Sequence, residues 1–298
     1  MVYYVLLVLA KLIPGEARRQ RFVGWARARF SVRAIVDAAL VEHLASIERA
    51  IHRTQMIDPP KVMSVDETLD ALIGGSSIVR FGDGELECIV KWQIAFQGPD
   101  DALAERLKEV LSSDEPGLLV AVNGLVYELG RESTSAERDF YLTQAPWMRP
   151  VLSRYLRPGK IYAAAEATLV HTMYRQGYDR RTYFRRFRSV WDGAKVVLIH
   201  GEGIFDDLTH DIFDNASSID HILAPRQNAF DRYDDILREA LRAPKDSLMI
   251  AILGPTATVL AYDLHRAGYR SLDLGHIAKS YDWWQNGRIG DEAEFFAD

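Results

Sequence analysis

The chain has 298 residues, of which 48% are hydrophobic, and this is enough to build one large globular domain or two modest ones. Its 36 basic and 42 acidic residues give a net charge of −6, which argues against nucleic acid as a partner. The single cysteine, Cys88, excludes an intramolecular disulfide framework and a cysteine-based zinc site, and it fits the reducing cytoplasm. We expect Cys88 to be a small buried hydrophobic side chain.

The N-terminal region differs from the rest of the chain in charge. Residues 1–33 contain seven basic residues and one acid, so this part carries a charge of +6 and the remainder −12. Its apolar start meets Lys11 and Pro14 after about three helical turns, too short to span a bilayer, and it lacks the features of a signal peptide. Arginines then alternate with aromatic residues such as Phe22 and Trp25, which predicts peripheral contact with the anionic inner face of the cell membrane. The alternative is that these helices pack on the protein itself or on a second subunit of a homo-oligomer.

A boundary between two parts of the chain lies near residue 58. From Val32 to Arg53, apolar residues recur at three- and four-residue steps, as one face of a helix requires. The prolines in Asp58-Pro59-Pro60 cannot continue that helix. We therefore predict a basic helical segment over residues 1–57 and a main domain over residues 58–298.

The main domain alternates between strand-like and helix-like patterns. Ser64 and Glu67 have the spacing of a capping box that begins a helix, which Gly74-Gly75 ends. The strand candidates, several of them apolar on both faces, are Ser76–Phe81, Leu118–Val122, Lys160–Ala164, Lys195–His200, Ser218–Leu223, Ser247–Leu253 and Arg270–Leu274. Helical patterns lie between them at Ala102–Leu111, Tyr233–Leu241 and Thr256–Ala267. Buried strands separated by helices predict an α/β fold, a Rossmann-like and mostly parallel sheet with helices on both faces.

The residues that follow the predicted strands are candidates for a site. In a parallel sheet, ligands bind beyond the carboxyl ends of the strands. Here the residues at these positions are almost all polar or glycine: Gly82-Asp83-Gly84-Glu85, Asn123, Glu166, Gly201-Glu202-Gly203, Pro225-Arg226-Gln227-Asn228, Gly254-Pro255-Thr256 and Gly275-His276. We therefore expect a polar ligand at this edge of the sheet.

Asp83 and Glu85 are the most distinctive pair among these residues. Gly82 and Gly84 give the turn backbone freedom that other residues lack. Two carboxylates in one site repel each other unless a cation or a proton lies between them, and oxygen ligands suit Mg²⁺ and Mn²⁺. The alternative is an acidic turn that caps the next helix.

Two glycine-containing turns offer backbone N–H groups to a phosphate. Gly254-Pro255-Thr256 leads from a strand into a helix, whose N-terminus favours an anion, and Thr256 adds a hydroxyl group. The alternative is an ordinary capped turn. Gly201 and Gly203 follow another strand, but they do not form a complete GxGxxG motif, so they either line a nucleotide site or only turn the chain.

His276 follows the last predicted strand and is a candidate metal ligand, phosphate donor or base. A lone histidine is more often structural. A functional role for His276 is therefore supported only by Asp273 nearby and by its position at the same edge of the sheet as the acidic turn. Arg226, Asn228 and Lys279 are candidates for contact with a diphosphate or a sugar, and the alternative is that they form a polar rim.

Several of these segments together resemble the GT-D type glycosyltransferases over about residues 62–285. The resemblance is carried by "SIVRFGDGE", "PRQNAFDRYDDI" and "ILGPTATVLAYDLHRAGYRSLDLGHI", which occur in the family's order. In that family a D-x-E motif and a divalent metal hold the diphosphate of a nucleotide sugar, and the motif falls on Asp83 and Glu85. The resemblance implies a GT-D type fold, Mn²⁺ or Mg²⁺ held by Asp83, Glu85 and His276, and a nucleotide-sugar donor, for which we expect a UDP-linked sugar.

The resemblance also implies that the turn at Gly254–Ala257 and the Gly275-His276 pair contribute to the nucleotide-sugar site, and the other strand-end residues are assigned from their positions after the strands. The residues assigned to the donor site are Arg80, Gly82, Gly84, Gly201, Gly203, Arg226, Asn228, Gly254, Pro255 and Thr256. Asp83, Glu85 and Asp273 are assigned to catalysis. Three strand-end carboxylates, Asp273, Glu166 and Glu202, are alternatives for a general base.

The function that follows is metal-dependent transfer of a sugar from a nucleotide-diphosphate donor to a glycan acceptor on lipid or protein, in polysaccharide or glycoprotein biosynthesis. One alternative is a metal-dependent phosphohydrolase or another nucleotide-binding α/β enzyme, because carboxylates and a phosphate cradle serve that chemistry too. A second alternative is a non-catalytic scaffold subunit that docks on a membrane complex through its basic N-terminal helices.

Overall fold

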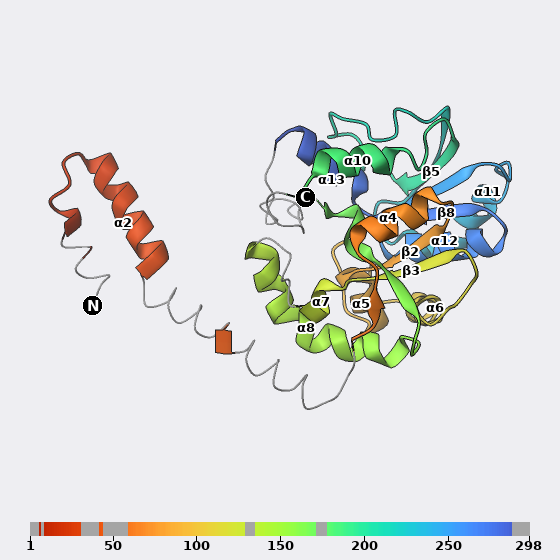
Figure 1. Cartoon of the computed structure of the whole chain (residues 1–298), viewed down its shortest axis with the longest axis horizontal. Helices are drawn as coiled ribbons and strands as arrows, with labels where there is room; N and C mark the ends of the chain where they lie inside the picture. The colour runs from red at the N-terminus through yellow and green to blue at the C-terminus, as the bar shows by residue number, and fades with distance from the viewer. Residues whose placement is uncertain are drawn as a thin grey trace. The chain divides into compact units, whose positions relative to one another are not determined.

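The computed structural model describes residues 6, 9–30, 42–43, 59–128, 135–170 and 178–287. The chain divides into two compact units, Met1–Ile57 and Asp58–Asp298. In the first unit, α2 spans Glu16–Phe30 (Figure 1). No helix within the described ranges is long and apolar enough to cross a membrane. The helix predicted over Val32–Arg53 lies outside the described residues, apart from residues 42–43.

The second unit is built on one parallel sheet. Within its described residues, eight strands lie in the order β1-β4-β3-β2-β8-β7-β5-β6, and every pair of neighbours is parallel. The strands are β1 (Lys61–Val62), β2 (Ser77–Phe81), β3 (Leu118–Val122), β4 (Ile161–Ala164), β5 (Lys195–Gly201), β6 (Ser218–Ala224), β7 (Leu248–Ile252) and β8 (Arg270–Asp273). The predicted α/β fold is confirmed, and each predicted strand ends within one residue of the observed one. β1 was not indicated because two residues are too short to give a periodic pattern.

Helices cover both faces of the sheet, as predicted (Figure 1). On one face, apolar side chains of the sheet share a core with α4 (Val65–Ile73), α10 (Arg180–Arg188) and α13 (Ile277–Gln285). On the other face they pack with α5 (Asp83–Ile89), α6 (Asp101–Leu111), α7 (Leu125–Glu128), α8 (Ser135–Tyr155), α11 (Tyr233–Ala240) and α12 (Pro255–Arg266). The sequence pattern did not indicate α8, because Pro146 and Pro150 lie inside it.

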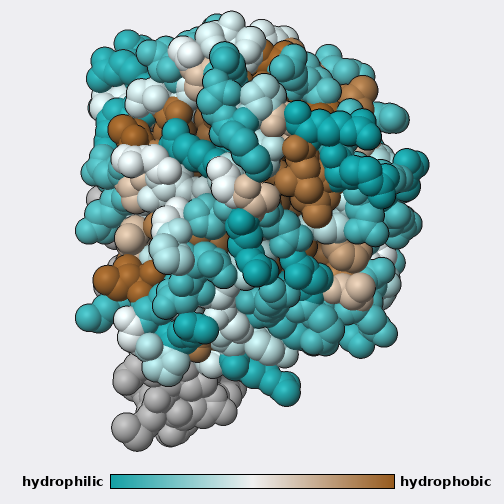
Figure 2. Space-filling model, turned by 90° about the vertical axis from the view of Figure 1, so that its right-hand side faces the viewer, coloured by the Kyte–Doolittle hydropathy of each residue, from teal (hydrophilic) through white to brown (hydrophobic). Residues whose placement is uncertain are grey.

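Many of the apolar side chains of the second unit are buried in these cores. Strand β2 is buried along its whole length, and so is β7. Cys88 of α5 is 3% exposed, which confirms the prediction of a buried thiol, and burial raises its pKa to about 12. The molecular face shown in Figure 2 is mainly hydrophilic, with hydrophobic side chains in separate areas.

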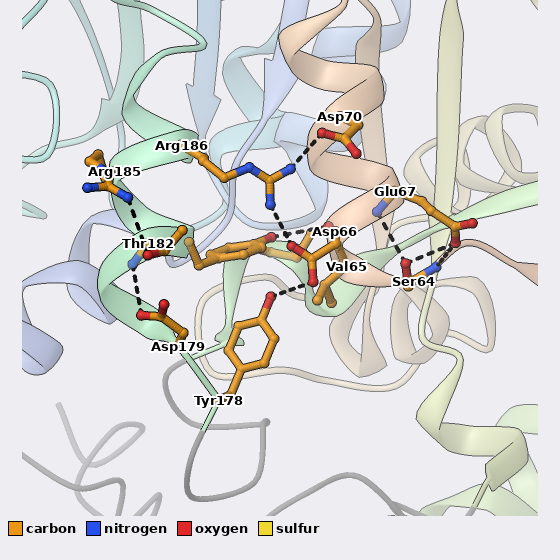
Figure 3. A network of polar contacts seen from close by, with 12 residues as sticks. Ser64, Val65, Asp66, Glu67, Asp70, Tyr178, Asp179, Thr182, Arg185 and Arg186 are labelled. Atoms are coloured by element: carbon orange, nitrogen blue, oxygen red, sulfur yellow. Dashed lines mark hydrogen bonds and ion pairs between the residues drawn. The ribbon is translucent and has the colours of Figure 1, made fainter.

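Helices α4 and α10 are joined by a polar network on the surface (Figure 3). The predicted capping box begins α4: the Ser64 N–H donates to Glu67 Oε2 at 2.7 Å, and the Glu67 N–H donates to Ser64 Oγ at 3.2 Å. Arg186 of α10 donates to Asp66 at 2.7 Å and to Asp70 at 2.6 Å, both of α4. The charged face of α10 is thereby fixed against the helix that precedes β2.

Strands β2 and β8 are neighbours at the centre of the sheet, and the chain leaves their ends toward opposite faces of it. After β2 it continues into α5 on one face, and after β8 it continues into α13 on the opposite face. In parallel α/β sheets such a switch point is where ligands bind. Asp83 begins α5 and His276 precedes α13, so the fold brings these two predicted residues to the same switch point.

Candidate functional site

The turn after β2 carries the D-x-E motif. α5 begins at Asp83, so both carboxylates lie in the first turn of a helix. Glu85 Oε2 accepts a hydrogen bond from the Gly82 N–H at 2.7 Å and caps this helix. Asp83 is exposed and Glu85 is half-buried. The interpretation of the turn as a helix cap therefore accounts for one oxygen of Glu85 and leaves Asp83 facing solvent.

Arg80 is the buried cation of the site, with 8% of its surface exposed. Its Nε donates to the Ala165 carbonyl at 3.1 Å, and its Nη1 lies 3.8 Å from Asp273 Oδ1. A Cβ at Gly275 would lie 1.8 Å from Arg80 Nη1, and Gly275 has φ +47°. Only glycine therefore fits at position 275, because both the backbone angle and the guanidinium group exclude a side chain.

Asp273 holds Arg80 rather than facing solvent. Asp273 is 3% exposed, and its Oδ2 accepts from the Arg80 N–H at 3.2 Å and from Thr258 Oγ1 at 3.0 Å. Its Oδ1 accepts from the Gly275 N–H at 3.2 Å. The sequence did not predict this role of Thr258, because a threonine in the interior of a helix, here α12, gives no signal of its own.

Burial, and after it the charges at and around Arg80, shift the pKa values of two predicted site residues. Burial, followed by the negative charge of Asp273, raises the pKa of Glu85 to about 7, and Arg80 opposes this shift. Burial, followed by the positive charges of Arg80 and Lys279, lowers the pKa of His276 to about 4. His276 is therefore neutral at neutral pH, the form that binds metals, and shifted groups of this kind gather at functional sites.

The donor set fits a divalent ion only in part. Among the described residues, no three His, Cys, Asp or Glu side chains lie together as a metal site, so the predicted trio of Asp83, Glu85 and His276 is not preassembled. The two carboxylates of the D-x-E turn lie next to each other, and Asp83 contributes to the raised pKa of Glu85. Mg²⁺ commonly binds one or two carboxylates together with substrate phosphates. The turn fits a metal of that kind, with the remaining ligands supplied by the substrate.

The turn between β7 and α12 is the predicted phosphate cradle. Gly254 precedes the helix with φ +53°, and Pro255 is its first residue, as predicted. Thr256 is fully buried, and its hydroxyl oxygen has no hydrogen-bond partner among the described residues. Asn228, in the loop after β6, is joined to Gly98, whose N–H donates to Asn228 Oδ1 at 2.8 Å. This contact brings the loop after α5 to the same edge of the sheet.

Gly201, Gly203 and Arg226 lie at the ends of β5 and β6, next to each other at the edge of the sheet. A Cβ at Gly201 would lie 3.2 Å from Arg226 Cα, so the two loops approach closely there. Gly203 has φ +74°, and Arg226 is exposed. β7 and β8 separate this group from the D-x-E turn on β2.

The other two candidate bases differ in exposure. Glu202 is exposed after β5, whereas Glu166 is 5% exposed after β4. Glu166 Oε1 accepts from the Leu125 N–H at 3.1 Å, and its Oε2 has no hydrogen-bond partner among the described residues. Burial raises the pKa of Glu166 to about 7. The side-chain amide of Asn123, which follows β3, donates to the Tyr141 hydroxyl oxygen at 2.6 Å. Asn123, Tyr141 and Glu166 thus form a polar cluster at the carboxyl ends of β3 and β4.

The parallel sheet carries two carboxylates at its switch point, in the first turn of α5. The family described as Glycosyltransferase GT-D fold matches residues 78–290. The chain belongs to this family, which confirms the resemblance seen in the sequence motifs.

Two curated relatives agree with this assignment. The chain is 32% identical over 251 residues to a probable glycosyl transferase Gly of Streptococcus gordonii, covering 80% of this chain and 36% of that protein. It is 28% identical over 248 residues to glycosyltransferase GlyD of Streptococcus pneumoniae serotype 4, covering 82% of this chain and 30% of that protein. The chain thus spans about a third of the length of these relatives.

Two solved structures have the same fold. One, described as a new glycosyltransferase (DUF1792) from Streptococcus sanguinis, has a TM-score of 0.73 and 29% identity, covering 80% of this chain and 93% of that one. Another, described as a highly conserved domain of unknown function 1792 with a distinct glycosyltransferase fold, has a TM-score of 0.71 and 27% identity, covering 84% and 86%. The fold of the second unit is therefore that of the GT-D glycosyltransferases.

Proposed function

We propose that this chain catalyses transfer of a sugar from a nucleotide-diphosphate donor to a hydroxyl group of a glycan acceptor. The observation that carries the proposal is the D-x-E turn at the switch point, where Asp83 and Glu85 lie in the first turn of α5. The charge of the buried Arg80 acts there on both Glu85 and the neutral His276. Membership of the GT-D family supports it. A UDP-linked sugar is the expected donor, and the acceptor is a glycan on lipid or protein.

In the reaction, the acceptor oxygen forms a bond to the anomeric carbon while the bond from that carbon to the diphosphate breaks. A divalent ion, Mn²⁺ or Mg²⁺, bound by Asp83 and Glu85 would supply positive charge against the departing diphosphate. The N–H groups at the start of α12, together with Arg226, would hold the phosphates. The acceptor proton leaves to a base, for which Glu166 and Glu202 are the candidates. We assign Asp273 the positioning of Arg80, because both of its oxygens accept hydrogen bonds.

The proposal is tested with a panel of UDP-, GDP-, dTDP- and CMP-linked sugars, with and without Mn²⁺, followed by calorimetry and by product analysis. We expect one donor to bind in a metal-dependent manner and to be transferred or slowly hydrolysed. Asp83→Asn and Glu85→Gln should each lower kcat/KM by roughly 100-fold or more, since each removes a carboxylate that would bind the divalent ion whose positive charge offsets the leaving group.

Glu87→Gln is the matched control, because this half-exposed carboxylate lies on the same helix and outside the motif. It should leave kcat/KM within about twofold of the wild type, as is usual for a substitution away from a site. Release of orthophosphate from phosphomonoesters, with no transfer from any nucleotide sugar, would instead identify a phosphohydrolase. Unchanged donor binding and unchanged cellular glycan in both carboxylate variants would identify a non-catalytic scaffold.

We also propose that the first unit contacts an anionic membrane at the inner face of the cell membrane. Leu12 is 77% exposed and Trp25 is 50% exposed, and both lie in or next to α2. Arg18, Arg19 and Arg21 on the same helix are exposed as well. Exposed apolar side chains together with arginines are what an anionic lipid surface binds.

A further inference from the structure

An exposed aromatic ring lies on the loop between α5 and α6, beside the proposed donor site. Phe96 is 37% exposed. Its carbonyl accepts from the Asn228 N–H at 2.8 Å, and the N–H of Gly98 donates to Asn228 Oδ1 at 2.8 Å. Asn228 has a left-handed backbone with φ +50°. Two hydrogen bonds to one residue thus fix the backbone at Phe96 and directly after it.

The ring lies against the start of α12. A Cβ at Gly254 would lie 2.6 Å from Phe96 Cε2, so the absence of a side chain at Gly254 makes room for the ring. The same loop also reaches the D-x-E turn, since a Cβ at Gly84 would lie 3.7 Å from Ile94 Cδ1. The loop therefore connects the turn proposed to hold the metal with the turn proposed to hold the phosphates.

We propose that Phe96 is the stacking platform for the nucleobase of the donor. This inference rests on the proposed function, because it takes a nucleoside diphosphate as the ligand. Only a ribose separates the base of a nucleoside diphosphate from its phosphates, so a ligand whose phosphates lie at the α12 N-terminus carries its base close to that turn. Phe96 presents a fixed, partly exposed aromatic ring there. Every base has a π face, so an aromatic side chain contributes to its binding whatever its hydrogen-bonding edge. A fixed ring also loses little conformational entropy when the ligand binds.

The test compares two probes on the full chain in the presence of Mn²⁺: the tightest-binding of UDP, GDP and dTDP, and inorganic pyrophosphate, which lacks a base. We expect Phe96→Ala to weaken binding of the nucleoside diphosphate roughly 5- to 150-fold, the range for loss of one base–aromatic stack. Binding of pyrophosphate should remain within about twofold, because the phosphate contacts are kept. Phe96→Tyr should restore the affinity for the nucleoside diphosphate.

Trp92→Ala is the matched control, since Trp92 is a 49% exposed aromatic residue close to the same loop, in contact with the Trp147 ring at 4.9 Å. It should change neither affinity. Equal weakening of both probes by Phe96→Ala would overturn the inference, because it would show that the ring only supports the loop. Nucleotide binding unchanged in Phe96→Ala would overturn it while leaving the proposed function standing. A wild-type chain that binds pyrophosphate but no nucleoside diphosphate would overturn both.

Discussion

At the scale of single residues, the site is organised around Arg80. The guanidinium group is buried, and it is held by the carboxylate of Asp273 and the carbonyl of Ala165. Gly275 gives it space, and Glu85 and His276 have pKa values that its charge affects. Arg80, which the sequence predicted to bind the donor, therefore also contributes to the pKa shifts of Glu85 and His276.

Substitution of Gly275 should be unusually costly for a loop glycine. We expect Gly275→Ala to lower the free energy of unfolding by about 1–2 kcal/mol for the left-handed backbone and by roughly 1–3 kcal/mol more for displacing the Arg80 guanidinium group. Urea unfolding measures the change. Gly268→Ala is the control, since Gly268 has φ +87° and no atom within 4 Å of its would-be Cβ, so it should show the backbone cost alone. Equal losses in both variants would mean that Arg80 moves aside freely.

Glu166 should make the stability of the protein depend on pH. Burial raises its pKa from the ordinary 4.5 to about 7, so the folded state keeps a proton that the unfolded chain has already lost. The stabilisation is complete below the unfolded pKa and is lost as the pH rises through the folded pKa. We expect this loss to be absent in Glu166→Gln. The difference in free energy of unfolding between the variant and the wild type should therefore shift by about 3 kcal/mol in favour of the variant from acid to neutral pH.

Urea unfolding of the two proteins at about pH 4 and about pH 8 gives this difference. Glu85 also has a raised pKa, but it is present in both proteins and so its contribution cancels. Glutamine keeps an oxygen that can accept from the Leu125 N–H, so that hydrogen bond is not lost. A difference between the proteins that is the same at both pH values would contradict the prediction.

At the scale of elements, α10 shows which contacts hold a helix on this sheet. Its polar side carries Arg186, which bridges Asp66 and Asp70 of α4 (Figure 3). The side chains of Asp66 and Asp70 are exposed, and that of Arg186 is one-third exposed. Its apolar side buries Phe187 completely, with ring contacts to Tyr183 and Trp191. Exposed ion pairs contribute little, whereas buried aromatic rings contribute strongly. The apolar side should therefore dominate.

This contrast gives a matched pair of variants on one helix. Phe187→Ala should lower the free energy of unfolding by about 3–5 kcal/mol, because it leaves a cavity in the core. Arg186→Ala should lower it by less than about 1 kcal/mol, because its ion pairs are screened by solvent. Thermal or urea unfolding distinguishes the two, and losses of similar size would show that the polar network carries more of the attachment than its exposure indicates.

At the scale of the whole molecule, the chain consists of two compact units with different charge. Residues 1–33 carry a net charge of +6 and the remainder of the chain −12, while the sheet and the candidate site lie in Asp58–Asp298. The family match, over residues 78–290, also falls entirely within the second unit. Membrane contact and sugar transfer are therefore proposed for separate parts of the chain.

Deletion of residues 1–57 tests this division. We expect the remaining chain to keep the cooperative unfolding transition and the nucleotide affinity of the full chain, because the sheet and the site lie outside the deletion. It should lose binding to vesicles that contain anionic lipid, as should a variant with Arg18, Arg19 and Arg21 changed to Gln, since each basic residue contributes about 1 kcal/mol at such a surface. Co-sedimentation with anionic and neutral vesicles measures this, and retained anionic binding by the shortened chain would rule out the proposed membrane role.

Much of this architecture could be predicted from the sequence. Apart from β1, the strands were placed correctly because an apolar run bounded by glycine or proline is a local signal. The capping box at Ser64 and Glu67 is a local signal too. Asp83 and Glu85 could be selected because two carboxylates between glycines at a strand end form a local pattern. α8 could not be predicted, because Pro146 and Pro150 contradict the local rule and packing on α7 and the sheet outweighs it.

The sequence by itself therefore determined the elements, the class of fold and the turn that carries the D-x-E motif, because these depend on residues within a few positions of one another. Only the tertiary structure decided that Asp273 holds Arg80, that Gly275 makes room for its guanidinium group, and that Phe96 lies on Gly254. These contacts join segments far apart in the chain. No local pattern encodes such contacts, since they exist only once the parallel sheet has brought the ends of its strands together.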